Sequence, residues 1–190
     1  EDHSLQTIFN DFTVDGNSSI NVEEDYIADE LDSYWNQTAT GTSAVTMMIE
    51  VAGAAQTNKF GIYDKSDPTK MIELFDGAVD VVDDRPDDYD YDSRTSFSIF
   101  EDGTVKVGDT VYLDAGFGMD FGFYLDSSAW DEGNGIHGGI FYSDSNLNLD
   151  GADHMATYRG TGDTVELNYM SNPGTWTPNE FILAWEDLYY

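Results

Sequence analysis

The sequence contains no cysteine and few basic residues: seven Lys and Arg stand against 38 Asp and Glu, which gives a formal net charge of −31. Without cysteine, a disulfide framework and a thiol nucleophile are both excluded. The shortage of basic residues argues against nucleic acid as a partner, because binding to phosphates requires a basic face. We therefore expect no nucleic-acid partner.

Long apolar runs are also absent. No stretch approaches the ~20 apolar residues that cross a bilayer, and an anionic membrane surface would repel so acidic a chain, so no membrane span is expected. Hydrophobic residues nevertheless make up 40% of the 190 residues and aromatic residues 14%, which is enough to build a core. The length suits one domain, and we predict a single domain over 1–190.

The motifs of several enzyme classes are missing as well. The chain has no G-x-S-x-G elbow, no H-E-x-x-H zinc motif and no phosphate-binding loop. A pair of carboxylates of the kind that a glycosidase uses is uninformative in a chain with 38 acids. We therefore predict that the protein is not an enzyme, with a glycosidase as the least favoured class of function.

Alternation of apolar and polar residues dominates what the sequence does contain. Such alternation is typical of half-buried strands, and Gly, Asp and Asn clusters separate the runs. The runs cover 43–51, 71–75, 93–100, 104–113, 121–125, 164–170 and 180–185. About ten strands at this spacing predict an all-β fold, an antiparallel jelly-roll-like β-sandwich with little helix beyond a short one around 23–31.

Aspartate outnumbers glutamate by 27 to 11. Asp favours turns and hard-cation sites, whereas Glu is the better helix former, so the bias points to acidic loops that bind metal. After residue 143, Asp and Asn alternate with other residues, and Gly151 then permits a bend in the chain. This pattern predicts a Ca²⁺ site formed by Asp144, Asn146, Asn148, Asp150 and Asp153. The site is not an EF-hand, because Thr157 stands where the bidentate Glu would be. The alternative is a loop whose side chains cap only its own backbone.

A second acidic segment covers 83–92 and has the density of carboxylates, though not the fixed spacing, of a calcium site. Its candidate ligands are Asp87, Asp88, Asp90 and Asp92. A solvated acidic loop is the alternative for this segment. Zinc is disfavoured at both places because the surroundings are rich in oxygen rather than nitrogen or sulfur. The sequence assigns no residues to the binding of any other ligand.

Five segments carry a resemblance to a known family. They are AGAAQTNKFGIYD (52–64), MIELFDGA (71–78), FGFYLDS (121–127), FYSDSNLNLDGADHMATYRG (141–160) and NEFILAWEDL (179–188). In this order they resemble exported bacterial proteins of the PEP-CTERM type, and more narrowly the domain of unknown function 4114, which also occurs in calcium-dependent adhesins. The resemblance implies a secreted calcium-associated β-sandwich. It also implies metal positions at Asn148, Asp150, Asp153, Glu186 and Asp187.

The sequence departs from that family in one respect. In the proteins that it resembles, the segment ending in Glu-Asp-Leu is followed by a further acidic turn and a final strand, whereas this chain stops at Tyr190. Near the other end, 8–14 reads IFNDFTV, which is similar to the missing strand. This segment is either an ordinary first strand or an exchanged strand within 1–15, which a neighbouring copy would receive along its open edge. In the second case Asn10 and Asp11 would complete the calcium site, and copies would join into a filament.

These patterns lead to one principal expectation of function. We expect a secreted, calcium-stabilised structural or adhesive protein of the bacterial surface or matrix, with filament formation by strand donation as a possible assembly. The alternative is a calcium-dependent domain that binds a peptide or a carbohydrate such as an extracellular polysaccharide. The high acidity is also typical of proteins from saline habitats, which would require molar salt but not calcium.

Overall fold

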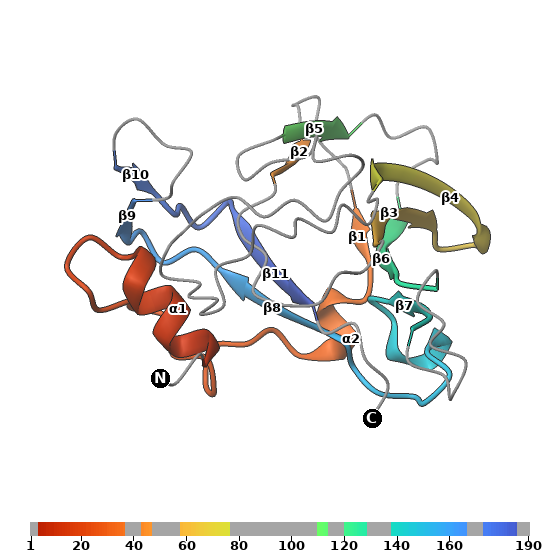
Figure 1. The fold of residues 1–190 in the computed structure, drawn as a ribbon, viewed down its shortest axis with the longest axis horizontal. Helices are drawn as coiled ribbons and strands as arrows, with labels where there is room; N and C mark the ends of the chain where they lie inside the picture. Colours follow the sequence, from red (N-terminus) through yellow and green to blue (C-terminus); the bar gives the residue numbers. More distant parts are fainter. Residues whose placement is uncertain are drawn as a thin grey trace, which may run out of the picture.

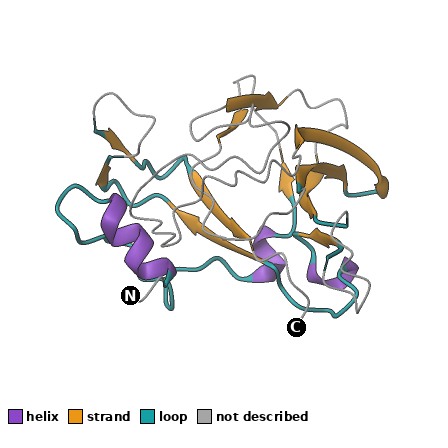
Figure 2. Ribbon diagram, in the orientation of Figure 1, coloured by secondary structure: helices purple, strands orange, loops and turns teal. Residues whose placement is uncertain are grey.

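The computed structural model describes residues 4–36, 43–46, 58–76, 110–113, 120–128, 138–166 and 173–185. Within these ranges antiparallel strands predominate, with two short α-helices and one 3-10 turn, which confirms the all-β prediction (Figure 2). The sandwich arrangement and the count of about ten strands stay predictions. No helix in the described part of the chain is long and apolar enough to span a membrane.

The largest sheet has five strands. Its order is β1 (Trp35–Asn36), β6 (Asp120–Asp126), β3 (Lys59–Asp64) and β4 (Asp67–Asp76), with β7 (Ile140–Tyr142) also paired to β6. Phe60 and Phe123 stack across the β3–β6 pair with ring centroids 5.7 Å apart. A core cluster around these rings includes Ile62, Leu125 and Met155.

Three shorter pairings complete the described strands. β8 (Met155–Arg159) pairs with β11 (Phe181–Trp185), β9 (Thr164–Val165) with β10 (Gly174–Thr175), and β2 (Ser43–Thr46) with β5 (Thr110–Leu113). Figure 1 shows β8 and β11 lying between helix α1 (Leu5–Phe12) and the five-stranded sheet. β8 therefore contributes to two core clusters. Its first residue, Met155, belongs to the cluster around Phe60 and Phe123, called the sheet cluster, and Tyr158 belongs to a second cluster under α1.

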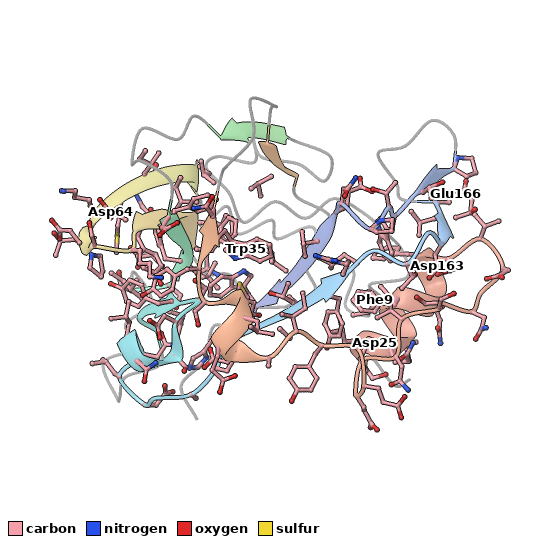
Figure 3. All side chains as sticks on the ribbon, turned by 180° about the vertical axis from the view of Figure 1, so that it is seen from behind. Phe9, Asp25, Trp35, Asp64, Asp163 and Glu166 are labelled. Carbon is pink, nitrogen blue, oxygen red and sulfur yellow. The ribbon has the colours of Figure 1, made fainter. Side chains whose placement is uncertain are left out.

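The second core cluster joins α1 to the strands beside it. Ile8, Phe9 and Phe12 are buried on one face of the helix, a spacing that matches the helical period. They pack with Tyr158 and Trp176, and Figure 3 shows Phe9 between α1 and β8. The amino-terminal segment is therefore part of the core of its own chain.

This arrangement corrects the strand predicted over 8–14. The segment begins as a helix because the side chain of Ser4 accepts a hydrogen bond from the backbone N–H of Thr7. The helix ends at Phe12, and the next residue, Thr13, forms an isolated bridge with Val165. The chain thus has a helix where the exchanged strand of 1–15 would lie, and filament formation by strand donation stays a prediction without support from this segment.

Several of the other predicted strands match strands of the structure. The runs 71–75, 121–125 and 180–185 coincide with β4, β6 and β11, and β2 and β5 cover parts of two further runs. Only Thr164–Val165 of the run 164–170 is a described strand, and the run 93–100 lies outside the described residues. The short helix expected around 23–31 is replaced by a turn and by helix α2 (Asp29–Asp32).

Candidate functional site

The loop between β7 and β8 contains the residues that the sequence singled out, and most of its acidic side chains cap its own bends. Asp144 Oδ1 accepts hydrogen bonds from Asn146, at 3.0 Å from the backbone N and 2.8 Å from Nδ2. Asp150 Oδ1 accepts from the N–H of Ala152, and Asp153 Oδ1 from that of Met155, both at 3.0 Å. These contacts are those of the self-capping alternative.

Asn148 connects this loop to β7 by hydrogen bonds. Its side chain is 6% exposed, and its Oδ1 accepts a hydrogen bond of 2.7 Å from the N–H of Tyr142. Its Nδ2 donates to the carbonyl oxygens of Tyr142 and Ala152, at 3.1 and 2.8 Å. The amide thus uses both its donors and its acceptor within the protein, which favours a structural role over metal ligation.

This role makes a prediction for Asn148→Asp. The variant keeps the shape and an acceptor but loses both donors, so two partly buried carbonyl oxygens face a carboxylate. We expect the free energy of unfolding to fall by about 2–4 kcal/mol, from two lost hydrogen bonds and the repulsion left behind. Urea denaturation in chelator measures the change, with Asn17→Asp at an exposed position outside this loop as the control. If Asn148 were instead a metal ligand, the variant would bind calcium more tightly and would be stabilised by it.

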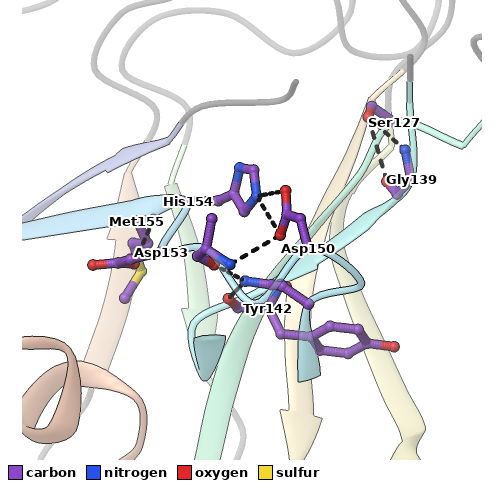
Figure 4. Close-up of polar contacts among 9 residues, drawn as sticks. Ser127, Gly139, Tyr142, Asp150, Asp153, His154 and Met155 are labelled. Carbon is purple, nitrogen blue, oxygen red and sulfur yellow. Dashed lines mark hydrogen bonds and ion pairs between the residues drawn. The ribbon is translucent and has the colours of Figure 1, made fainter. Parts of the chain in front are cut away.

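His154 is the next buried polar residue along the loop. It is 2% exposed, and its Nε2 lies 3.0 Å from Asp150 Oδ2 and 3.3 Å from Oδ1 (Figure 4). Its ring packs against Phe141 with a centroid distance of 4.3 Å. The imidazole therefore orients Asp150 toward the interior, where a direct metal contact would compete with the histidine.

The segment 27–34 lies against this loop although more than 100 residues separate them in the sequence. Ile27 donates its N–H to the carbonyl of Thr157 at 2.8 Å, which aligns the approach to α2 with β8. Ser145 Oγ then donates to Asp29 Oδ2 at 2.6 Å, and Tyr34 OH donates to Asp144 Oδ2 at 2.7 Å. Burial, followed by the hydrogen bond to Asp144, raises the pKa of Tyr34. The neutral phenol is thereby kept as a donor.

Asp32 on α2 is the carboxylate with the most unusual surroundings. It is 1% exposed, and neither of its oxygens has a hydrogen-bond partner of good geometry among the described residues. Burial raises the pKa of Asp32 to about 7, and the negative charges of Asp153 and Asp29 raise it further, while the nearby Thr157 hydroxyl lowers it. Asp29 and Asp153 therefore lie close enough for their charges to act on Asp32.

The two neighbouring acids share parts of this environment. Asp29 Oδ1 is buried without a partner in the described part of the chain, while its Oδ2 accepts from Ser145. Asp153 is an exposed residue, yet partial burial of its carboxyl and the charge of Asp29 raise its pKa. We call Asp29, Asp32, Asp153 and Thr157 the Asp32 cluster. Of its acids, the sequence pointed only to Asp153.

Of the remaining predicted ligands, the structure describes only Asp11. Asp11 lies on α1, at the opposite end of the molecule from β7 and the loop that follows it (Figure 1). Glu186, Asp187 and the second cluster, Asp87, Asp88, Asp90 and Asp92, lie outside the described residues. As placed within the described ranges, no three His, Asp or Glu side chains form a group that could hold a metal ion. A cation there would need oxygen ligands other than carboxylates, or a small shift of the acids.

Comparison with known proteins adds no further constraint. No protein-family model matches the chain, and neither a curated protein nor a solved structure matches it. The resemblance to domain of unknown function 4114 therefore stays a prediction from the five sequence segments.

Proposed function

We propose that the protein is a secreted, non-catalytic structural or adhesive domain of a bacterial surface or matrix, stabilised by Ca²⁺. The observation that supports this proposal best is the Asp32 cluster, in which a buried carboxylate without a partner lies near two more acids. Such a group is unfavourable unless a proton or a cation neutralises it. Calcium is abundant outside cells and prefers oxygen ligands.

The place of the cluster explains why neutralising it would matter for the whole domain. Thr157 lies on β8 between Met155 of the sheet cluster and Tyr158 of the cluster under α1. Repulsion among the acids acts at this junction of the two hydrophobic clusters. A bound cation would connect α2 to β8 there, in a chain whose lack of cysteine excludes disulfides.

Calcium is expected to stabilise the protein measurably. If the ion binds only the folded state, a free concentration of about 100 times Kd adds ~2.7 kcal/mol to the free energy of unfolding. For a chain of this size that corresponds to roughly 5–10 °C in the melting temperature. Differential scanning fluorimetry in calcium and in excess EDTA, at equal ionic strength, measures this shift.

Two controls separate the possible causes of such a shift. Mg²⁺ at the same concentration reports how much of the effect is general to divalent cations, and molar NaCl reports screening of the net charge of −31. A melting temperature that is the same in calcium and EDTA, but rises steeply with NaCl, would contradict the proposal and favour a protein adapted to salt.

The second candidate function is calcium-dependent binding of a peptide or carbohydrate, and exposed apolar side chains favour it. Leu31 on α2 and Leu149 in the loop between β7 and β8 are 75% and 81% exposed, and Tyr26 is 54% exposed. Leu31 lies on the same helix as Asp32, and Leu149 lies in the same loop as Asp153. A glycan array and a peptide array, each probed with and without calcium, test this candidate; binding that requires calcium would select it over a purely structural role.

A further inference from the structure

Asp32 differs in burial from every other acid that the structure describes. Its exposure of 1% makes it the one buried Asp or Glu in these ranges, and neither of its oxygens has a hydrogen-bond partner of good geometry there. None of the described Lys or Arg residues forms an ion pair with it, and the ion pairs of Lys59 and Lys70 are with other acids. The charge of Asp32 is therefore not compensated by any described basic side chain.

Thr157 supplies a second buried oxygen, on a different element. It is fully buried on β8, at 0% exposure, and its Oγ1 has no hydrogen-bond partner among the described residues. The hydroxyl lies near enough to Asp32 to lower the pKa of that carboxyl. A buried hydroxyl normally forms a hydrogen bond of good geometry. The hydroxyl of Thr157 and the carboxylate of Asp32 lie near each other without one, which leaves both groups able to bind a common ligand.

All the unpaired atoms of the cluster are oxygens. They are Asp29 Oδ1, Asp32 Oδ1, Asp32 Oδ2 and Thr157 Oγ1. A hard cation prefers such a donor set, whereas a transition metal would favour imidazole or thiolate. The positions of α2 and β8 are fixed by the Ile27–Thr157 bridge, so the oxygens of Asp32 and Thr157 are held by backbone pairing and not by a free loop.

We propose that Asp32 and Thr157 bind one Ca²⁺ directly at the junction of α2 and β8. Asp29 and Asp153 add negative charge around the ion, through water or after a small shift of their side chains. No three acids converge in the described ranges, so this site has a single carboxylate in direct contact with the ion. Water completes the six to eight oxygens that calcium takes. This site rests on the proposed calcium-stabilised function and names the residues responsible for it.

The test is a calcium titration of the full chain by isothermal titration calorimetry, combined with melting in calcium and in EDTA. Asp32→Asn removes the central charge and Thr157→Val removes the hydroxyl at nearly constant shape. We expect each to weaken the tightest calcium site by about tenfold or more. Each should also reduce the calcium-dependent rise in melting temperature. Asp67→Asn, at an acid that caps Thr69 on β4, serves as the matched control and should leave both quantities unchanged.

The outcomes separate this site from the function on which it rests. If the wild type binds calcium and is stabilised by it, but Asp32→Asn and Thr157→Val behave like the wild type, the calcium sites lie elsewhere and this assignment is wrong while the proposed function stands. If the wild type neither binds calcium nor responds to it, both are wrong. Circular dichroism checks that each variant is folded; should Asp32→Asn not fold, the shape-conserving Thr157→Val decides the assignment alone.

Discussion

Replacing Phe9 by alanine is expected to lower the free energy of unfolding by about 3–5 kcal/mol, the usual cost of removing a buried aromatic ring. Phe9 is 1% exposed and meets Tyr158 and Trp176 edge to face, with centroid distances of 5.2 and 5.8 Å. Its removal leaves a cavity between α1 and β8 that the surrounding rings cannot fill without losing these contacts. Chemical denaturation of the purified protein in urea measures the change.

Val14→Ala is the control for this experiment. Val14 follows α1 directly but is 55% exposed, so shortening its side chain should change the free energy of unfolding by less than about 0.5 kcal/mol. Comparable losses in the two variants would show that α1 is not packed as described. The pair thus tests the helix itself, which the sequence had suggested to be a strand.

The same variant bears on whether the amino-terminal segment is exchanged between copies. If α1 packs into its own chain, the melting temperature of wild type and Phe9→Ala does not depend on protein concentration. If a neighbouring copy supplied the segment, dilution would lower the melting temperature by mass action. A melting series over a hundredfold range of concentration distinguishes the two arrangements.

The strands of this protein were predictable because their signal is local. β6 and β11 alternate apolar and polar residues or carry unbroken apolar runs between turn residues, and such patterns require only neighbouring positions. Helix α1 was missed because IFNDFTV carries two periods at once. Phe12 and Val14 alternate as in a strand, whereas Ile8, Phe9 and Phe12 follow a helical face, and the cap at Ser4 decides between them.

One part of the candidate site was predictable from neighbouring residues, and the other depends on contacts between residues that are far apart in the sequence. The loop between β7 and β8 was located from its Asp and Asn residues, and its bends are the ones that such side chains favour. The burial of Asp32 was not predictable. It depends on the pairing of Ile27 with Thr157, which are separated by 130 positions, and nothing in the segment around α2 distinguishes Asp32 from the other acids there.

Without calcium, the protein is expected to become less stable as the pH rises from about 4 to above 7. Burial raises the pKa of Asp32 from 3.8 to about 7 in the folded state. Between these two values the folded protein binds a proton that the unfolded chain has already released. The free energy of unfolding therefore falls with increasing pH across this window, and the contribution of Asp32 is fully lost above pH 7.

The size of this effect follows from the shift itself. A change of about three pH units corresponds to about 4 kcal/mol at most, since each unit is worth about 1.4 kcal/mol. Asp153 acts in the same direction because its pKa is also raised. Asp67 acts in the opposite direction, since hydrogen bonding to Thr69 lowers its pKa, but its contribution changes only below about pH 4. The two kinds of acid are thus separated by their pH windows.

Asp32→Asn isolates the contribution of this one carboxyl. We expect urea denaturation in EDTA to give similar stabilities for the variant and the wild type at pH 4.5. At pH 8 the variant should be the more stable by up to about 4 kcal/mol, because it has no buried charge to form. Asp67→Asn should follow the wild type over this range. Adding calcium at pH 8 should narrow this difference by about 1 kcal/mol or more, since the ion offsets the charge in the wild type and has lost its central ligand in the variant. If the difference between wild type and Asp32→Asn were the same at both pH values, Asp32 would not titrate in this window, and its carboxylate would have to be neutralised by a group of the protein itself.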